Sequence, residues 1–148
     1  VPIPRDSDGF VRRECPSCMR QFKWHDGPAN EEAEQHAAPA AYSCPLCGTP
    51  AAADAWNTAE QVEIAQQIAI PQFMEKLQDD LESMFRGVKG MTYRRGGPVD
   101  AVEDYEPLTE PDDMTIVVSP CHSYEPVKVP DDHSGPLFCL ICGSAFAL

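Results

Sequence analysis

The sequence predicts a small, metal-stabilised α+β protein, in which two short antiparallel β modules are joined by a helix and an acidic linker. Three observations lead to this prediction. Six of the seven cysteines stand in Cys-x-x-Cys pairs, one long stretch has helical periodicity, and the last cysteine pair repeats the surroundings of an earlier one. The 148 residues include fifteen prolines and nine glycines, and no long apolar run for one large core. We therefore expect each module to depend on metal for its stability.

Residues 1–53 form the first predicted module, which contains two of the cysteine pairs. In each pair the two sulfurs point to the same side of a tight turn. Four thiolates then make the tetrahedral shell that Zn²⁺ accepts, with Zn–S bonds of about 2.3 Å. Gly48 follows the second pair, where a backbone that leaves a metal turn often needs a positive φ. The predicted ligands of this first site are Cys15, Cys18, Cys44 and Cys47.

Short strands and one short helix surround these ligands. Residues 10–14 lead into the first pair, and residues 19–24 (M-R-Q-F-K-W) alternate apolar and polar side chains, as in a half-buried strand. In the insertion that follows, Asn30 is placed to cap a short helix with acidic residues in its first turn, and Pro39 ends that helix. The first module is therefore predicted to be a β hairpin with a helical insertion.

The sequences C-P-S-C and C-P-L-C-G resemble a zinc ribbon with rubredoxin-like knuckles, and the resemblance covers about residues 10–50 and 114–148. It implies short β hairpins held by structural zinc. The superfamily serves transcription machinery, ribosomes, adaptor subunits and enzyme insertions, so the fold alone does not select a function. Iron in the same four cysteines, as in rubredoxin-like electron carriers, is an alternative. Those proteins are more compact and normally have glycine where Met19 stands here.

Residues 54–90 contain the one long helical pattern, which begins at about Asn57. Its apolar stripe consists of Val62, Ala65, Ala69, Phe73, Leu77, Leu81, Met84 and Val88. Pro71 removes one backbone donor and clashes with the preceding turn, so we expect a kink or a break there. Such a stripe usually packs on a core. A partner groove or a dimer seam is the alternative, because small ribbons offer little core to cover.

Residues 91–113 form a predicted flexible linker. A basic, glycine-containing segment comes first, and residues 99–113 then hold seven acidic side chains and no basic one. This composition is typical of disordered segments. Apolar residues within it offer an alternative, in which the segment packs on the helix. These residues are Val99, Val102, Tyr105 and Leu108.

Residues 114–148 form the second predicted module. The sequence C-P-L-C-G-T at 44–49 recurs as C-L-I-C-G-S at 139–144, an offset of 95 residues (139 minus 44). A strand-like stretch at 114–118 comes before it, and a turn at 131–135 separates the remaining strands. The repeat and its surroundings predict a second ribbon, with a shorter connecting segment between its two metal turns.

The second site has only three cysteines, Cys121, Cys139 and Cys142. Zinc accepts three thiolates with one imidazole, and His122 is the favoured fourth ligand, although neighbouring residues in an extended chain point apart. His133 would lie up to about 20 Å from Cys139 along a straight strand. A degenerate ribbon without metal is the other alternative. His25 and His36 are expected at the surface, although either could complete the site in space. We expect two zinc ions.

The charge distribution argues against a nucleic-acid binder. The net charge is −13, and an acidic surface repels a phosphate backbone. We expect a partner protein instead, with self-association through the helix as a further option. Nucleic-acid binding or a transcription-associated role is the alternative function. It would use Arg12, Arg13, Arg20, Lys23 and the patch Lys89–Arg95.

No catalytic constellation stands out, so we expect a non-enzymatic protein-interaction or adaptor module. The sequence contains no evident nucleophile–base pair, phosphate loop or pair of catalytic carboxylates. No segment approaches the ~20 apolar residues of a membrane span. The start of the chain lacks the apolar part of a signal peptide, and Cys-x-x-Cys spacing favours metal over disulfides. These features predict a reduced, cytoplasmic metalloprotein.

Overall fold

The computed structural model describes residues 3–88, 90 and 108–147. The chain divides into two units, one made of Pro2–Ala59 with Leu108–Leu148 and one that covers Glu60–Pro107. We call the first the ribbon unit, and describe the two separately. Much of the predicted linker, including three of its four apolar residues, and most of the predicted basic patch Lys89–Arg95 lie outside the described residues.

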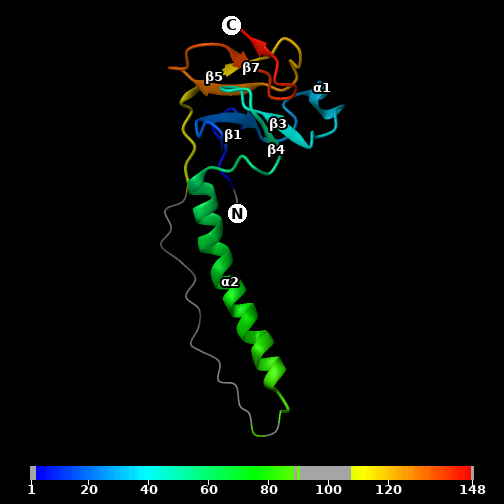
Figure 1. Cartoon of the computed structure of the whole chain (residues 1–148), viewed down its shortest axis with the longest axis vertical. Helices are drawn as coiled ribbons and strands as arrows, with labels where there is room; N and C mark the ends of the chain where they lie inside the picture. Colours follow the sequence, from blue (N-terminus) through cyan, green and yellow to red (C-terminus); the bar gives the residue numbers. More distant parts are fainter. Residues whose placement is uncertain (1–2, 89, 91–107, 148) are drawn as a thin grey trace. The chain divides into compact units, whose positions relative to one another are not determined.

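A four-stranded antiparallel sheet joins the two predicted modules (Figure 1). Strand β1 (Phe10–Glu14) pairs with β2 (Gln21–His25), and β5 (Met114–Val117) pairs with β6 (Val127–Pro130). The two hairpins meet because β2 pairs with β6, in the order β1-β2-β6-β5. The predicted strands at 10–14, 19–24 and 114–118 are thus confirmed to within two residues. Their union in one sheet was not predicted.

Two smaller hairpins carry the repeated cysteine turns and pack on each other. They consist of β3 (Ala41–Ser43) with β4 (Pro50–Ala52), and β7 (Leu137–Phe138) with β8 (Ala145–Phe146). The Ser43 N–H donates to the Leu140 carbonyl at 2.8 Å, and the Phe138 N–H donates to the Pro45 carbonyl at 2.9 Å. Ser43 and Phe138, like Pro45 and Leu140, are separated by the repeat offset of 95 residues. The two copies of the repeat therefore bind each other reciprocally.

Both modules contribute to one small hydrophobic core. Phe22 and Trp56 are almost fully buried and contact edge to face, with ring centroids 5.7 Å apart. The rest of this core consists of Cys15, Cys44, Leu46, Val117, Val127, Val129, Leu137 and Leu140. Because neither module alone supplies enough apolar surface, each depends on the other as well as on its own turns.

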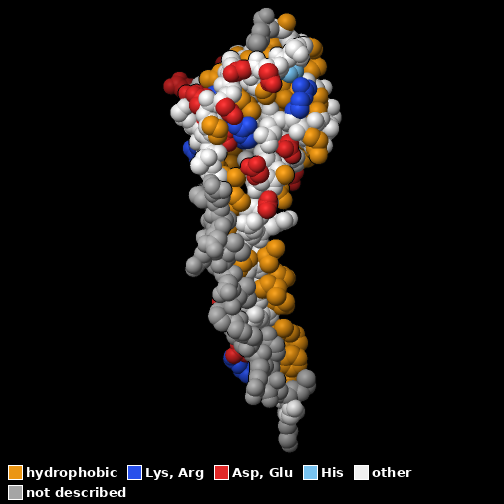
Figure 2. All heavy atoms as spheres, turned by 90° about the vertical axis from the view of Figure 1, so that its left-hand side faces the viewer, with side chains coloured by type: hydrophobic (Ala, Val, Ile, Leu, Met, Phe, Trp, Pro, Cys, Tyr) orange, Lys and Arg blue, Asp and Glu red, His pale blue; other side chains and the backbone are white. Residues whose placement is uncertain are grey.

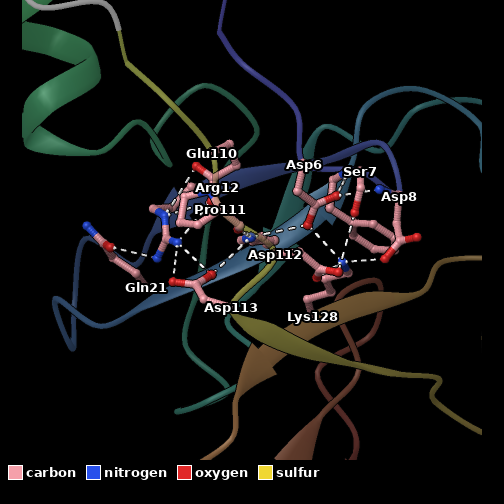
Figure 3. Close-up of polar contacts among 12 residues, drawn as sticks. Asp6, Ser7, Asp8, Arg12, Gln21, Glu110, Pro111, Asp112, Asp113 and Lys128 are labelled. Atoms are coloured by element: carbon pink, nitrogen blue, oxygen red, sulfur yellow. Dashed lines mark hydrogen bonds and ion pairs between the residues drawn. The ribbon is translucent and has the colours of Figure 1, made fainter.

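A buried network of charges links the centre of the sheet to the segments that precede β1 and β5 (Figure 3). Lys23 and Lys128 are opposite each other in β2 and β6 and are 0% and 1% exposed. The Asp6 carboxylate lies 3.1 Å from the Lys23 ammonium and 2.8 Å from that of Lys128. Burial raises the pKa of Asp6, but hydrogen bonds from Lys128, the Phe10 N–H and Lys23 outweigh it and hold that pKa well below its usual range.

The end of the predicted acidic linker is part of this network. Glu110 lies 2.9 Å from the Lys23 ammonium and 2.9 Å from the Arg12 guanidinium, and Asp112 lies 2.8 Å from Lys128. Buried lysines need such partners, since an unpaired ammonium inside a protein is costly. The acidic residues just before β5 therefore neutralise cations of the sheet.

The insertion helix α1 (Glu31–Glu34) confirms the predicted cap. Asn30 has extended backbone angles, and its side chain accepts a hydrogen bond from the Ala33 N–H at 2.9 Å. Glu31 and Glu32 lie in the first turn, as predicted. The helix ends at Glu34, before the predicted stop.

The second unit contains one long helix, α2 (Ala59–Phe85). It begins two residues after the predicted start and continues through Pro71 as one element, so the break considered for this position is absent. Several of its large apolar side chains are exposed rather than buried. Among the described helices, none is both long enough and apolar enough to span a membrane.

Candidate metal centres

The first centre brings together the four cysteines predicted for it, Cys15, Cys18, Cys44 and Cys47. Their sulfurs all lie within 4.8 Å of one another. The Cys15 and Cys47 sulfurs are 3.7 Å apart, and those of Cys18 and Cys44 are 3.9 Å apart. A tetrahedron with metal–sulfur bonds of about 2.3 Å has edges of about 3.8 Å. Disulfides, with an S–S bond of about 2.05 Å, are excluded because all seven cysteines are free.

Three metal turns share one backbone pattern. In the turn that starts at Cys44, the Gly48 N–H donates to the Cys44 carbonyl at 2.8 Å, and the Cys44 N–H donates to the Thr49 carbonyl at 3.0 Å. The turns that start at Cys15 and Cys139 make the same two bonds. This pattern turns the chain back so that both sulfurs of a pair face one point.

The residue four positions after the first cysteine has a positive φ in each of these turns. The angle is 77° at Gly48 and 75° at Gly143, where glycine adopts it without strain. Met19 has the same conformation, with φ of 62°, and is the one non-glycine residue with positive φ in the described part of the chain. The geometry of the turn therefore holds Met19 in a backbone conformation that methionine normally disfavours.

Backbone amides favour ionised sulfur at the first centre. The Ser17 and Cys18 N–H groups lie 3.3 and 3.4 Å from the Cys15 sulfur, and the Leu46 N–H lies 3.4 Å from that of Cys44. Burial raises the pKa of Cys15 and, more strongly, that of Cys44. Thiols in such a place ionise when a bound cation offsets the burial, as Zn²⁺ does. The donor set therefore fits a divalent metal.

The second centre contains three cysteines and one histidine, Cys121, His122, Cys139 and Cys142, whose ligand atoms lie within 4.8 Å of one another. The sulfurs of Cys121 and Cys142 are 3.4 Å apart, and His122 Nδ1 lies 3.3 Å from the Cys139 sulfur. Cys121 and Cys142 are exposed, whereas Cys139 is buried. This set matches the Cys₃His composition of many structural zinc sites.

Ser119 explains how two consecutive residues reach the same centre. The chain bends after β5, and the buried Ser119 hydroxyl accepts a hydrogen bond from the His122 N–H at 3.2 Å. The same hydroxyl lies within donating distance of the Cys139 sulfur, at 3.2 Å. The objection that neighbouring side chains point apart applies to an extended chain, and this segment is not extended. No spacing rule marks Ser119, so the sequence analysis missed it.

The other histidines lie outside the second centre. The imidazole of His133 lies 3.2 Å from the Pro136 carbonyl and 3.4 Å from Arg20. His25 Nδ1 lies 3.1 Å from the Gly27 carbonyl, and His36 stacks on Tyr124. The structure therefore places His122, and none of these three, with the cysteines.

The predicted nucleic-acid contacts are largely engaged within the protein. Lys23 is buried, and Arg12 pairs with acidic residues before β5. The Arg13 guanidinium lies over the Trp24 ring, 4.7 Å from its centroid, and Arg20 donates to the Leu46 carbonyl. These side chains have less freedom to contact a phosphate backbone than the sequence suggests.

No protein family, no curated protein and no solved structure matches this chain. Two cysteine-rich clusters are the groups of possible metal ligands among the described residues. They are compatible with metal binding in their donor types and distances.

Proposed function

We propose that this chain is a non-enzymatic, zinc-stabilised protein-interaction module that acts as an adaptor. Two metal ions stabilise the ribbon unit, and α2 contacts a partner protein. The observation that carries the proposal is the apolar stripe that α2 leaves exposed.

Zinc is the metal that both donor sets favour. Four thiolates, or three thiolates with one imidazole, are shells that structural zinc takes. Protein ligands close each shell, so neither centre leaves a position for a substrate, and this supports a structural role. Iron also accepts four thiolates in tetrahedral geometry, so metal analysis of the purified protein separates zinc from a rubredoxin-like electron carrier.

The exposed stripe of α2 has the spacing of a helix–helix contact. Its residues follow steps of four, three, four and three: Ile70, Met74, Leu77, Leu81 and Met84. All of them are exposed except Leu81, which is half-buried. This is the 3.5-residue period with which two helices pack along a common seam. Ile70 is 58% exposed and Met84 is 64% exposed, although both are large apolar side chains. Figure 2 shows hydrophobic side chains gathered along this helix. Exposed apolar surface of this extent marks interaction sites.

Charge indicates what kind of partner fits. Within α2, six acidic side chains accompany a single lysine. A second copy would bring two acidic helices together, whereas a helix with an apolar seam flanked by lysine or arginine would complement both features. We therefore propose a basic, amphipathic helix of another protein as the occupant.

A pair of synthetic helices tests the proposal. Each has about four heptads with leucine at positions a and d; one has lysine at e and g, and the other has glutamate there. We expect calorimetry to detect binding of the lysine helix to the full chain, and binding of the glutamate helix to be at least about tenfold weaker. The double variant Leu77→Gln/Met84→Gln should lose binding, and the matched control Gln66→Asn/Gln72→Asn should retain it.

Three outcomes would overturn parts of the proposal. Equal binding of both helices would remove the charge argument. A stable dimer of the chain alone, abolished by Leu77→Gln/Met84→Gln, would replace the foreign helix by a second copy. Sub-micromolar binding of single-stranded nucleic acid at physiological salt would favour the nucleic-acid alternative.

A further inference from the structure

A pocket of about 300 Å³ lies within the ribbon unit, where the insertion of the first module meets the metal turns of the second. Trp24 and Tyr42 line it from the first module, and Tyr124 and Glu125 line it from the segment after His122. The pocket therefore exists only when the two modules are paired. Neither metal centre contributes a ligand atom to it.

Contacts among the aromatic side chains fix the walls of this pocket. The rings of Trp24 and Tyr42 have centroids 4.7 Å apart. The Tyr124 ring stacks on His36 with a centroid distance of 4.1 Å and an angle of 2° between the planes. Aromatic walls with carboxylate oxygens nearby are the environment that attracts organic cations.

Glu125 is the one acidic residue that lines the pocket. It is partly buried, and in the described part of the chain no hydrogen bond or ion pair involves its carboxylate, although the His25 imidazole, which also lines the pocket, interacts with it electrostatically. Other half-buried and buried acids of the ribbon unit, such as Asp6 and Glu110, are paired with lysine or arginine. A partly desolvated carboxylate that makes no direct hydrogen bond or ion pair gains most from a cation that enters the pocket.

We propose that this pocket binds the ammonium group of a lysine side chain that a partner protein presents. The lysine stem would lie against apolar residues such as Leu140 and Pro39, and its ammonium would reach the Glu125 carboxylate. A single carboxylate suits the compact charge of lysine better than the planar fork of arginine, which favours paired acceptors. The proposal rests on the proposed function, because it assumes a basic partner protein.

The test uses Nα-acetyl-lysine methylamide as a probe and the norleucine analogue, which lacks the charge, as its control. The chain has two tryptophans, so the indole N–H signals of Trp24 and Trp56 can be followed separately by NMR at pH 7.5. We expect the lysine probe to shift the Trp24 signal and to leave that of the buried Trp56 in place. The norleucine analogue should bind about tenfold more weakly.

Matched variants connect the binding to the pocket. Glu125→Gln keeps the shape and removes the charge, and should weaken lysine binding about tenfold. Glu63→Gln, which removes the same charge from the exposed surface of α2, should leave it unchanged. Ala53→Phe fills the pocket from an exposed position and should abolish binding even though Glu125 is intact.

The proposal is overturned if the lysine probe leaves the Trp24 signal unchanged, or if the norleucine analogue binds equally well. Equal binding by Ala53→Phe and the wild type would overturn it too, independently of whether Glu125→Gln folds. The helix-binding experiment on α2 uses other residues. Loss of the pocket result alone therefore leaves the proposed function standing, and loss of the helix result alone removes the adaptor role.

Discussion

The two candidate metal centres have four ligands each but differ in burial. At the first centre, Cys15 and Cys44 are 0% exposed and belong to the hydrophobic core. At the second, Cys121 and Cys142 are exposed, and one cysteine alone is buried. A full shell of Cys₄ has a charge of −2 with zinc, and Cys₃His has −1. Two similar donor sets can thus contribute differently to the stability of the fold, because the surrounding residues determine how much of the packing depends on the metal.

The largest effect is expected from Cys44→Ser. Structural zinc contributes roughly 10–16 kcal/mol of apparent binding free energy in small domains, which is as large as the whole stability of a typical domain. Loss of a buried ligand should therefore unfold the ribbon unit, and amide NMR signals of β1 and β2 should lose their dispersion. The matched change at the exposed centre, Cys142→Ser, should lower the metal content and keep those signals. Retention of a dispersed spectrum by Cys44→Ser would show that the first centre is dispensable.

A smaller effect is expected from Asp6→Ala, which acts on both modules at once. The change leaves Lys23 and Lys128 buried without the carboxylate that they share. A buried charge left without any partner costs about 3–5 kcal/mol, and because Glu110 and Asp112 still pair with the two lysines, we expect the lower end of this range. Urea denaturation should show a loss of this order. Asp132→Asn, at an exposed position, should change the free energy of unfolding by less than about 0.5 kcal/mol. A loss no larger than that of the control would mean that other acids replace Asp6.

Substitutions of Gly48 and Gly143, the two glycines of the repeat, allow the metal turns that start at Cys44 and Cys139 to be compared directly. A Cβ at Gly48 would lie 2.8 Å from the Phe138 ring, whereas one at Gly143 would lie 3.0 Å from the movable hydroxyl of Ser43. Both positions have positive φ, which strains alanine by about 1 kcal/mol. We expect Gly48→Ala to cost about 2–3 kcal/mol and Gly143→Ala about 1 kcal/mol. Equal losses in thermal denaturation would contradict the difference in packing.

The smallest effect is expected from Met19→Gly. Met19 adopts the left-handed conformation that glycine adopts elsewhere in these turns. Relief of this strain, about 1–2 kcal/mol, exceeds the extra chain entropy of glycine, about 0.5–1 kcal/mol. The melting temperature should therefore rise slightly, and Met19→Ala, which keeps the strain, should not raise it. A lower melting temperature for Met19→Gly would indicate that the exposed methionine side chain is itself stabilising.

Local features of the fold could be predicted from the sequence. The capping residue Asn30, the strand at 10–14 and the cysteine pairs depend on residues close together in the chain, where backbone geometry and periodicity decide the outcome. The choice of His122 over His133 also agrees with where the structure places these side chains. The bend that brings His122 to this centre depends on the hydrogen bond to Ser119, which no sequence pattern indicates.

The pairing of the modules could not be predicted in this way. Lys23 and Lys128 look like solvent-facing positions of alternating strands, and their burial depends on carboxylates such as Glu110, which is 87 residues from Lys23 (110 minus 23). The alternation of side chains within one strand does not indicate a partner that is so distant in the sequence. For the same reason the pocket at Glu125 could not be predicted from the sequence, since its walls come from segments about 80 to 100 residues apart.

Metal stoichiometry with staged removal tests the central claim most directly, namely that two structural zinc centres of unequal burial hold this fold. Native mass spectrometry of the purified chain should show two zinc ions. A chelator should remove one ion quickly and the other only as the ribbon unit unfolds. His122→Ala should eliminate the fast phase alone, and His133→Ala should leave both phases unchanged. A folded protein without metal, an iron-loaded protein, or release of both ions at one rate would contradict the account.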